Sequence, residues 1–139
     1  MTLHVYTARV GYAGADALDI TRRRADADAR SGMSFLASSI AEAFAAPRWL
    51  LNAAKGYSSA LPPGVDPMPR EAFARWRWYE RHYLAAMTRS RDVHRGVWEA
   101  TLRRDVVTGL CFCGNVAACH RALWAGVLVT MGAAYKGER

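Results

Sequence analysis

The sequence predicts a small single α/β domain over residues 1–139, with a Rossmann-like three-layer arrangement of a short, mostly parallel sheet flanked by helices. Two segments rich in β-branched and aromatic residues, 3–10 and 106–112, are expected to be strands. Helical apolar spacing recurs between them, and the order strand, helix, strand over residues 106–136 is that of a parallel crossover unit. A hydrophobic fraction of 52% suffices for one core.

The first predicted strand, residues 3–10, ends at a turn that contains Gly11 and Gly14. Polar residues follow in what the sequence predicts to be a loop. Ligands of open α/β sheets bind beyond the carboxyl ends of strands, so the aspartates of this loop are expected either to cap local turns or to face a ligand pocket. The residues expected to contribute to a site here are Arg9, Tyr12, Asp16 and Asp19.

The next part of the chain alternates irregular and helical patterns. Residues 22–33 are charged and alanine-rich without an apolar stripe, which predicts an exposed irregular connection. Helices are predicted over residues 34–44 and 48–54, the second one beginning directly after Pro47. Residues 56–69 contain four of the five prolines and are expected to be an irregular loop, either an active-site lid or a surface excursion.

Helical periodicity returns at residue 70. Large apolar side chains recur at the spacing of one helix face, and arginines mostly occupy the other face. The apolar set, which we expect to be core, is Phe73, Trp76, Tyr83, Leu84 and Met87. Ser90 or Asp92 is predicted to cap a further helix that ends before Asp105.

The second predicted strand, residues 106–112, leads through a tight loop into a long apolar helix. Gly132 is expected to end that helix after Met131, and residues 133–136 are expected to add a short final strand. The connection between the second strand and the helix is the most distinctive part of the chain, because it contains all three cysteines.

Cys119, His120 and Arg121 are predicted to form the first turn of this last helix. Free backbone N–H groups and the helix dipole attract anions there and lower the pKa of a thiol. We expect Cys119, His120 and Asp16 to be catalytic, with an aspartate acting either as general base or as a ligand of a ribose. The side chains expected to hold the ligand are Arg9, Tyr12, Asp19, Cys111 and Arg121.

Two alternatives remain open for the cysteines. The first is a zinc site, since thiolates and imidazole suit this metal; its ligands would be Cys111, Cys113, Cys119 and His120. The Cys-x-Cys and adjacent Cys-His spacings differ from those of the usual zinc knuckles. The second alternative is that the cysteines pack as small apolar residues and have no chemical role.

The formal net charge of +7 favours phosphate-bearing partners. Only two of the 19 basic residues, Lys55 and Lys136, are lysine, and the arginines are dispersed among acidic residues. A dispersed surplus supports nucleic acid as a partner only weakly. No long apolar run and no signal-peptide pattern is present, which predicts a soluble cytoplasmic protein without a membrane partner.

Several segments together resemble the uncharacterised domain-of-unknown-function family 488. They are Tyr6 to Tyr12, Asp16 to Thr21, Ala46-Pro47-x-Trp49, Trp98-Glu99-Ala100, Cys111-x-Cys113…Cys119-His120-Arg121 and Gly132-Ala133-x-Tyr135-x-Gly137-Glu138. The resemblance covers most of the chain. It implies a small α/β fold, in a family with many bacterial or phage-encoded members, and it implies no established activity. The family does not always carry cysteine at the position of Cys113, which favours the other three cysteine-loop residues and Arg121 as the site.

These observations lead to two functional expectations. The first is an enzyme or ligand-binding protein that acts on a phosphate-bearing or nucleoside-like small molecule at the Cys119-His120-Arg121 helix start. The second is a non-enzymatic module that binds nucleic acid or another partner and contains a structural zinc held by the cysteines.

Overall fold

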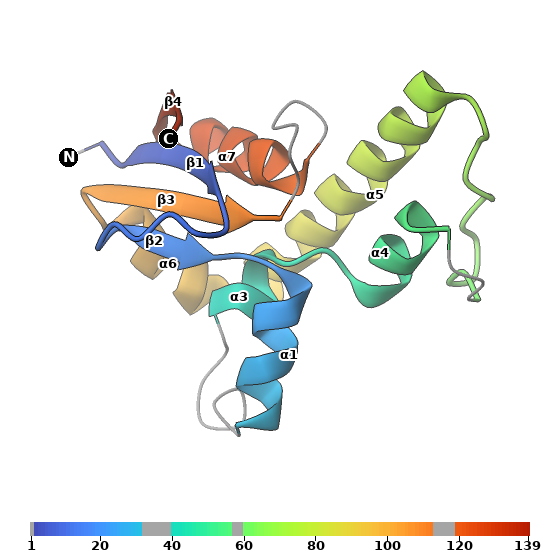
Figure 1. Ribbon diagram of the computed structural model, residues 1–139, viewed down its shortest axis with the longest axis horizontal. Helices are drawn as coiled ribbons and strands as arrows, with labels where there is room; N and C mark the ends of the chain where they lie inside the picture. The colour runs from blue at the N-terminus through green and yellow to red at the C-terminus, as the bar shows by residue number, and fades with distance from the viewer. Residues whose placement is uncertain (1, 32–39, 57–59, 113–118) are drawn as a thin grey trace.

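A computed structural model describes residues 2–31, 40–56, 60–112 and 119–139. The described part of the chain contains a four-stranded, all-parallel sheet of order β2-β3-β1-β4 and six helices (Figure 1). The predicted α/β class with a parallel sheet flanked by helices is therefore confirmed. The strands are β1 His4–Arg9, β2 Ala17–Asp19, β3 Val106–Cys111 and β4 Ala134–Glu138. The helices are α1 Arg22–Arg30, α3 Ile40–Phe44, α4 Arg48–Ala54, α5 Ala72–Val93, α6 Arg95–Leu102 and α7 His120–Thr130.

β1 and β3 form the centre of the sheet, in a register that pairs Val5 with Val107 and Arg9 with Cys111. Side chains alternate between the two faces of a strand, so Val5, Val107 and Cys111 lie on the same face. Val5 and Val107 are buried in the main hydrophobic core, together with residues of α3, α5, α6 and α7. The helix-covered face thus extends to Cys111, at the carboxyl end of β3.

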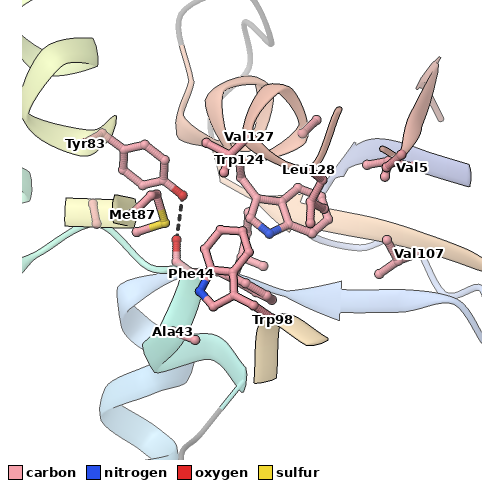
Figure 2. Close-up of a cluster of buried hydrophobic side chains, with 14 of the residues drawn as sticks. Val5, Ala43, Phe44, Tyr83, Met87, Trp98, Val107, Trp124, Val127 and Leu128 are labelled. Carbon is pink, nitrogen blue, oxygen red and sulfur yellow. Dashed lines mark hydrogen bonds between the residues drawn. The ribbon is translucent and has the colours of Figure 1, made fainter. Parts of the chain in front are cut away.

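The core on this face is built largely from aromatic rings. Phe44 lies edge-on to both Trp98 and Trp124, at centroid distances of 4.8 and 5.7 Å (Figure 2). The Tyr83 hydroxyl donates to the Phe44 carbonyl at 2.7 Å, which satisfies a buried polar group (Figure 2). Trp124 also packs over Gly109 of β3, where no larger side chain would fit. These contacts hold α7 against the sheet.

β2 was not predicted, since residues 17–19 were expected to belong to a loop. The strand pairs with Thr108 to Leu110 of β3 and not with β1, although it follows β1 in sequence. Residues 10–16 must therefore cross β3 on their way back to the start of β2. The hydrogen bond from the Thr108 amide to the Asp16 carbonyl, 2.8 Å, fixes the end of this crossing.

The prediction that residues 22–33 are irregular was wrong for residues 22–30, which form α1. Thr21 caps the helix by accepting a hydrogen bond from the Arg24 amide at 3.1 Å. Arg24 and Asp28 form an i,i+4 ion pair at 3.0 Å, and Ala25 is buried against α3 residues. A side-chain cap and charge pairs stabilise this helix, and neither produces the broad apolar stripe on which the prediction depended.

α5 is longer than predicted. Glu71 caps its start by accepting hydrogen bonds from the amides of residues 73 and 74. Ser90, predicted to cap the next helix, lies inside α5, where its hydroxyl donates to the Ala43 carbonyl and accepts from the Trp98 indole. Phe73, predicted to be core, is 70% exposed, whereas Trp78 is buried. Tyr83 and Met87 are buried as predicted, so the prediction holds for these two members of the face and fails at the start of the face.

The carboxyl-terminal half follows the prediction closely. β3, α7 and β4 form the expected crossover unit, in which β4 pairs with β1. Residues 60–69 contain neither helix nor strand, as expected; residues 57–59 of the same predicted loop lie outside the described part. Among the described residues no helix has the length and apolar character needed to cross a membrane.

Candidate functional site

Cys111, Cys119 and His120 form a buried group that we call the cysteine–histidine cluster. Cys111 is the last residue of β3, and Cys119 immediately precedes α7, so the two ends of the intervening loop meet at this point. The two Sγ atoms are 3.0 Å apart, in contact with each other but not joined in a disulfide. His120 Nδ1 lies 3.3 Å from Cys111 Sγ. Cys113 lies outside the described residues.

The orientation of His120 is fixed from its other side. Its Nε2 atom lies 3.0 Å from the carbonyl oxygen of Ile20, just after β2. A carbonyl oxygen only accepts hydrogen bonds, so Nε2 carries a proton. In the neutral imidazole, Nδ1 then has a free lone pair directed at Cys111. The Tyr83 ring, with its centroid 5.5 Å from that of His120, packs against the imidazole.

Arg121 is predicted to hold an anionic ligand, and the structure gives its guanidinium a protein partner. Nη2 donates to Glu138 Oε1 at 2.8 Å, and Nη1 donates to Cys119 Sγ at 3.6 Å. Thr7 donates to the second oxygen of Glu138. Burial lowers the pKa of Arg121, but the hydrogen bond with Glu138 and the charges of Cys119 and Glu138 raise it, and the net direction is upward. Arg121 thus connects the cysteine–histidine cluster to β4.

A cavity of about 640 Å³ borders the cysteine–histidine cluster. Its lining residues come from the carboxyl end of β3, the start of α7 and the helices α1, α4 and α5, among others. We call it the basic cavity, because four cationic side chains and no acidic one are among the described residues that line it. The cationic residues are Arg22, Arg23, Lys55 and Arg75; the aromatic ones are Trp76, Tyr79 and Phe112.

The four cations differ in the partners that the protein gives them. Arg22 forms an ion pair with Glu42 at 3.0 Å, and the Arg23 guanidinium lies over the Phe112 ring. Within the described part of the chain, Lys55 and Arg75 form no ion pair. The cavity therefore has a positive charge that an anionic ligand would balance.

Aromatic residues of α5 form a continuous series that leads to the cluster. The rings of Trp76 and Tyr79 stack at 5.7 Å, and those of Tyr79 and Tyr83 stack at 6.3 Å. Tyr83 in turn contacts His120. The apolar wall of the cavity is thus held in place by stacking within one helix.

The chain was also compared with known proteins. No family model, curated protein or solved structure matches it. The resemblance to domain-of-unknown-function family 488 therefore stays a prediction, and the function is inferred from the site itself.

The structure does not bring every predicted site residue to the basic cavity. Cys111, Cys119 and His120 line it, but Arg9 and Asp19 do not. Arg9 is exposed at the end of β1. Asp19 accepts hydrogen bonds from the amide and the hydroxyl of Thr21, which is the turn-capping role that the sequence left open.

Asp16 and Tyr12 belong to a second polar group on the opposite face of the sheet. The Tyr12 hydroxyl donates to Asp16 Oδ1 at 2.9 Å, Thr108 donates to Oδ2, and Arg139 lies 3.6 Å from Oδ2. The hydrogen bond from Thr108 lowers the pKa of Asp16, with Tyr12 and Arg139 acting in the same direction, while burial opposes the shift. In turn, the hydrogen bond to Asp16 raises the pKa of Tyr12.

The lowered pKa of Asp16 predicts an acid-dependent loss of stability. Asp16→Asn is expected to cost about 1 kcal/mol at neutral pH, because it removes charge-assisted hydrogen bonds. A carboxyl whose pKa is lower when folded stabilises the protein fully above its ordinary pKa of 3.8, and this stabilisation is lost as the pH falls below that value. Urea unfolding of both proteins across this pH range should show that the difference between their free energies of unfolding becomes smaller as the pH falls.

Asp92→Asn is the matched control, since this side chain is 82% exposed. Its free energy of unfolding should equal that of the wild type at every pH. A difference between Asp16→Asn and the wild type that stays constant down to pH values well below 3.8 would contradict the role of the Asp16 charge.

Sequence reasoning missed most residues of the basic cavity. It placed Trp76 in the core and assigned the arginines of α1 to an exposed connection. It also gave Glu138 no role, although this residue pairs with Arg121. Clustering of arginine and tryptophan at positions 75 and 76 was a usable signal for the cavity, but it required knowing that α5 faces the end of β3.

Proposed function

We propose that this protein binds a phosphate-bearing aromatic small molecule, of the nucleotide class, in the basic cavity. The observation that carries the proposal is that aromatic rings, cationic side chains and the cysteine–histidine cluster line one and the same space of about 640 Å³. Cavities of about 300–1,000 Å³ are typical of small-molecule sites. A nucleotide combines an aromatic ring with negative charge, as this lining requires.

The residues divide into two recognition functions. Arg75 and Lys55 suit the phosphate, because neither has an acidic partner among the described residues. Trp76 and Phe112 suit the base, because both are only partly buried and line the cavity. Cys119 and His120 face the same space and are the groups that could act on a bound molecule. Asp16, on the opposite sheet face, is not among them.

We expect Arg75→Ala to weaken the binding of a nucleoside 5′-monophosphate about tenfold, since a hydrogen bond to a charged group contributes about 1.5–3 kcal/mol. Isothermal titration calorimetry on the purified protein measures this affinity. Arg77→Ala is the matched control. Arg77 lies on the same helix, is exposed, pairs with Glu80 and does not line the cavity.

The nucleoside without phosphate and inorganic phosphate alone should each bind more weakly than the nucleotide. Equal losses in Arg75→Ala and Arg77→Ala would mean that only overall charge matters, which contradicts a site in the cavity. If no nucleotide binds while duplex DNA binds with a steep salt dependence, the nucleic-acid module becomes the better interpretation.

A further inference from the structure

The cysteine–histidine cluster has the composition of a soft-metal site. Cys111, Cys119 and His120 each offer one ligand atom, and the three atoms lie within 4.8 Å of one another in a buried position. Two thiolates and one imidazole are ligands that zinc prefers. The donor atoms of the cluster therefore match those of a zinc site.

Two of the three distances between the ligand atoms are close to those that zinc requires. Zinc bonds of about 2.3 Å to sulfur and about 2.0–2.1 Å to nitrogen, at tetrahedral angles, separate the ligand atoms by about 3.5–3.8 Å. The Sγ atoms of Cys111 and Cys119 are 3.0 Å apart, and Nδ1 of His120 is 3.3 Å from Cys111 Sγ. The third pair, Cys119 Sγ and the His120 ring nitrogen, lies within 4.8 Å, so shifts of up to about 1 Å in side-chain position would place all three at bonding distance.

The surroundings of the three ligands provide the second, independent argument. A metal-binding histidine usually donates its other ring N–H to a carbonyl or carboxylate, which fixes the tautomer and the ring orientation. His120 does this through Nε2 and the Ile20 carbonyl, and its Nδ1 lone pair points towards Cys111. Arg121 contacts Cys119 Sγ, a position in which it stabilises a thiolate.

The charges also balance in the buried site. Two thiolates neutralise one divalent cation, and the positive charge of Arg121 is balanced by Glu138 at 2.8 Å. A metal bound here would therefore leave no large net charge in the core. All three ligands line the basic cavity, so the metal that they share would border it as well.

The described residues offer three ligand atoms here, and all three line the basic cavity; we propose that Cys111, Cys119 and His120 bind one zinc ion whose fourth coordination position opens into that cavity. Sites with three protein ligands and an open position are those in which zinc contacts water or substrate, whereas structural sites are closed by four protein ligands. The open position would accept water or an oxygen atom of a bound anion. This inference stands whether or not the cavity binds nucleotides.

Cobalt(II) titration of the metal-free, reduced full-length protein tests the site under anaerobic conditions. Cobalt reports on its ligands through a thiolate charge-transfer band and visible bands that depend on coordination. We expect about one equivalent to bind and to be displaced by zinc. Cys119→Ser and His120→Gln should each weaken cobalt binding by more than about 100-fold, because even replacing a residue that only hydrogen-bonds to a metal ligand lowers metal affinity by about 10–100-fold.

Cys113→Ser and His4→Gln are the matched controls and should bind cobalt like the wild type. His4 is exposed at the start of β1. Absence of cobalt binding by the wild-type protein would overturn the proposal. A loss in Cys113→Ser equal to that in Cys119→Ser would also overturn it, because the site would then be closed by a fourth protein ligand.

A second measurement on the wild type keeps the open position testable even where a ligand variant fails to fold. Imidazole added to the cobalt protein should change the visible bands, because it can occupy the fourth position. Visible bands that stay unchanged at saturating imidazole would contradict an accessible position. Neither readout depends on nucleotide binding, so failure of this inference and failure of the proposed function are distinguishable.

Discussion

Replacing Glu138 with alanine is expected to lower the free energy of unfolding by about 3 kcal/mol, near the lower end of the cost of breaking a buried ion pair. The Arg121 side chain is only 1% exposed, so its charge has little access to water once the carboxylate is gone. Glu138 itself is 31% exposed, which places the effect at the lower end of that range. Equilibrium urea unfolding of the two proteins measures the difference.

A double-mutant cycle separates the charge from the packing at this site. Arg121→Met removes the buried charge while keeping an extended apolar side chain, so the double variant with Glu138→Ala should be more stable than Glu138→Ala alone. Glu138→Gln keeps the shape of the side chain and one acceptor oxygen, so its free energy of unfolding should fall by less than that of the alanine variant. If the free energy of unfolding of Glu138→Ala is within about 0.5 kcal/mol of the wild-type value, the ion pair contributes no more to stability than an exposed one.

The same pair illustrates what could not be inferred from sequence. Arg121 was predicted to be a ligand-binding residue because arginine in the first turn of a helix commonly binds anions. Its actual partner comes from β4, and the two meet because β4 pairs with β1 beside α7. Residues 17 positions apart are brought together by sheet topology, which no local pattern contains.

β1, β3 and α7 were predicted because their burial is visible in their composition. β3 and α7 are apolar over most of their length and β1 over half of it, because both strands are central and α7 packs against them. β2 has three residues, and its pairing depends on β3. α1 is stabilised by a cap and ion pairs with little apolar surface. The formation of β2 and of α1 therefore depends more on contacts with other elements than on their own apolar pattern.

The candidate site divides in the same way. The cysteine–histidine cluster was predictable, since its members lie at the two ends of one loop between β3 and α7. The cationic and aromatic wall of the basic cavity was not, because α1, α4 and α5 supply it from distant parts of the chain. Asp16 was predicted to belong to the same site as Cys111. It lies just before β2, but on the sheet face opposite Cys111.

Gly109→Ala is expected to destabilise the protein by about 1–3 kcal/mol through overpacking at the centre of the sheet. An added Cβ would lie 2.8 Å from Cε3 of Trp124 and closer still to Cζ3. Both residues are buried, and Trp124 also packs against Phe44, so the ring cannot move away without disturbing the aromatic core. The same change at Gly126, an exposed position of α7 with open space around it, should instead stabilise by about 0.5–1 kcal/mol.

The opposite signs of two identical substitutions make this the sharpest test of the packing between α7 and β3. Trp124→Leu in the background of Gly109→Ala should reduce the penalty of the alanine, because a smaller side chain vacates the space that Cβ needs. Thermal or urea unfolding of the four proteins in this cycle measures the coupling. Additive effects of Gly109→Ala and Trp124→Leu would show that the two side chains do not compete for one space, and that α7 lies differently on the sheet.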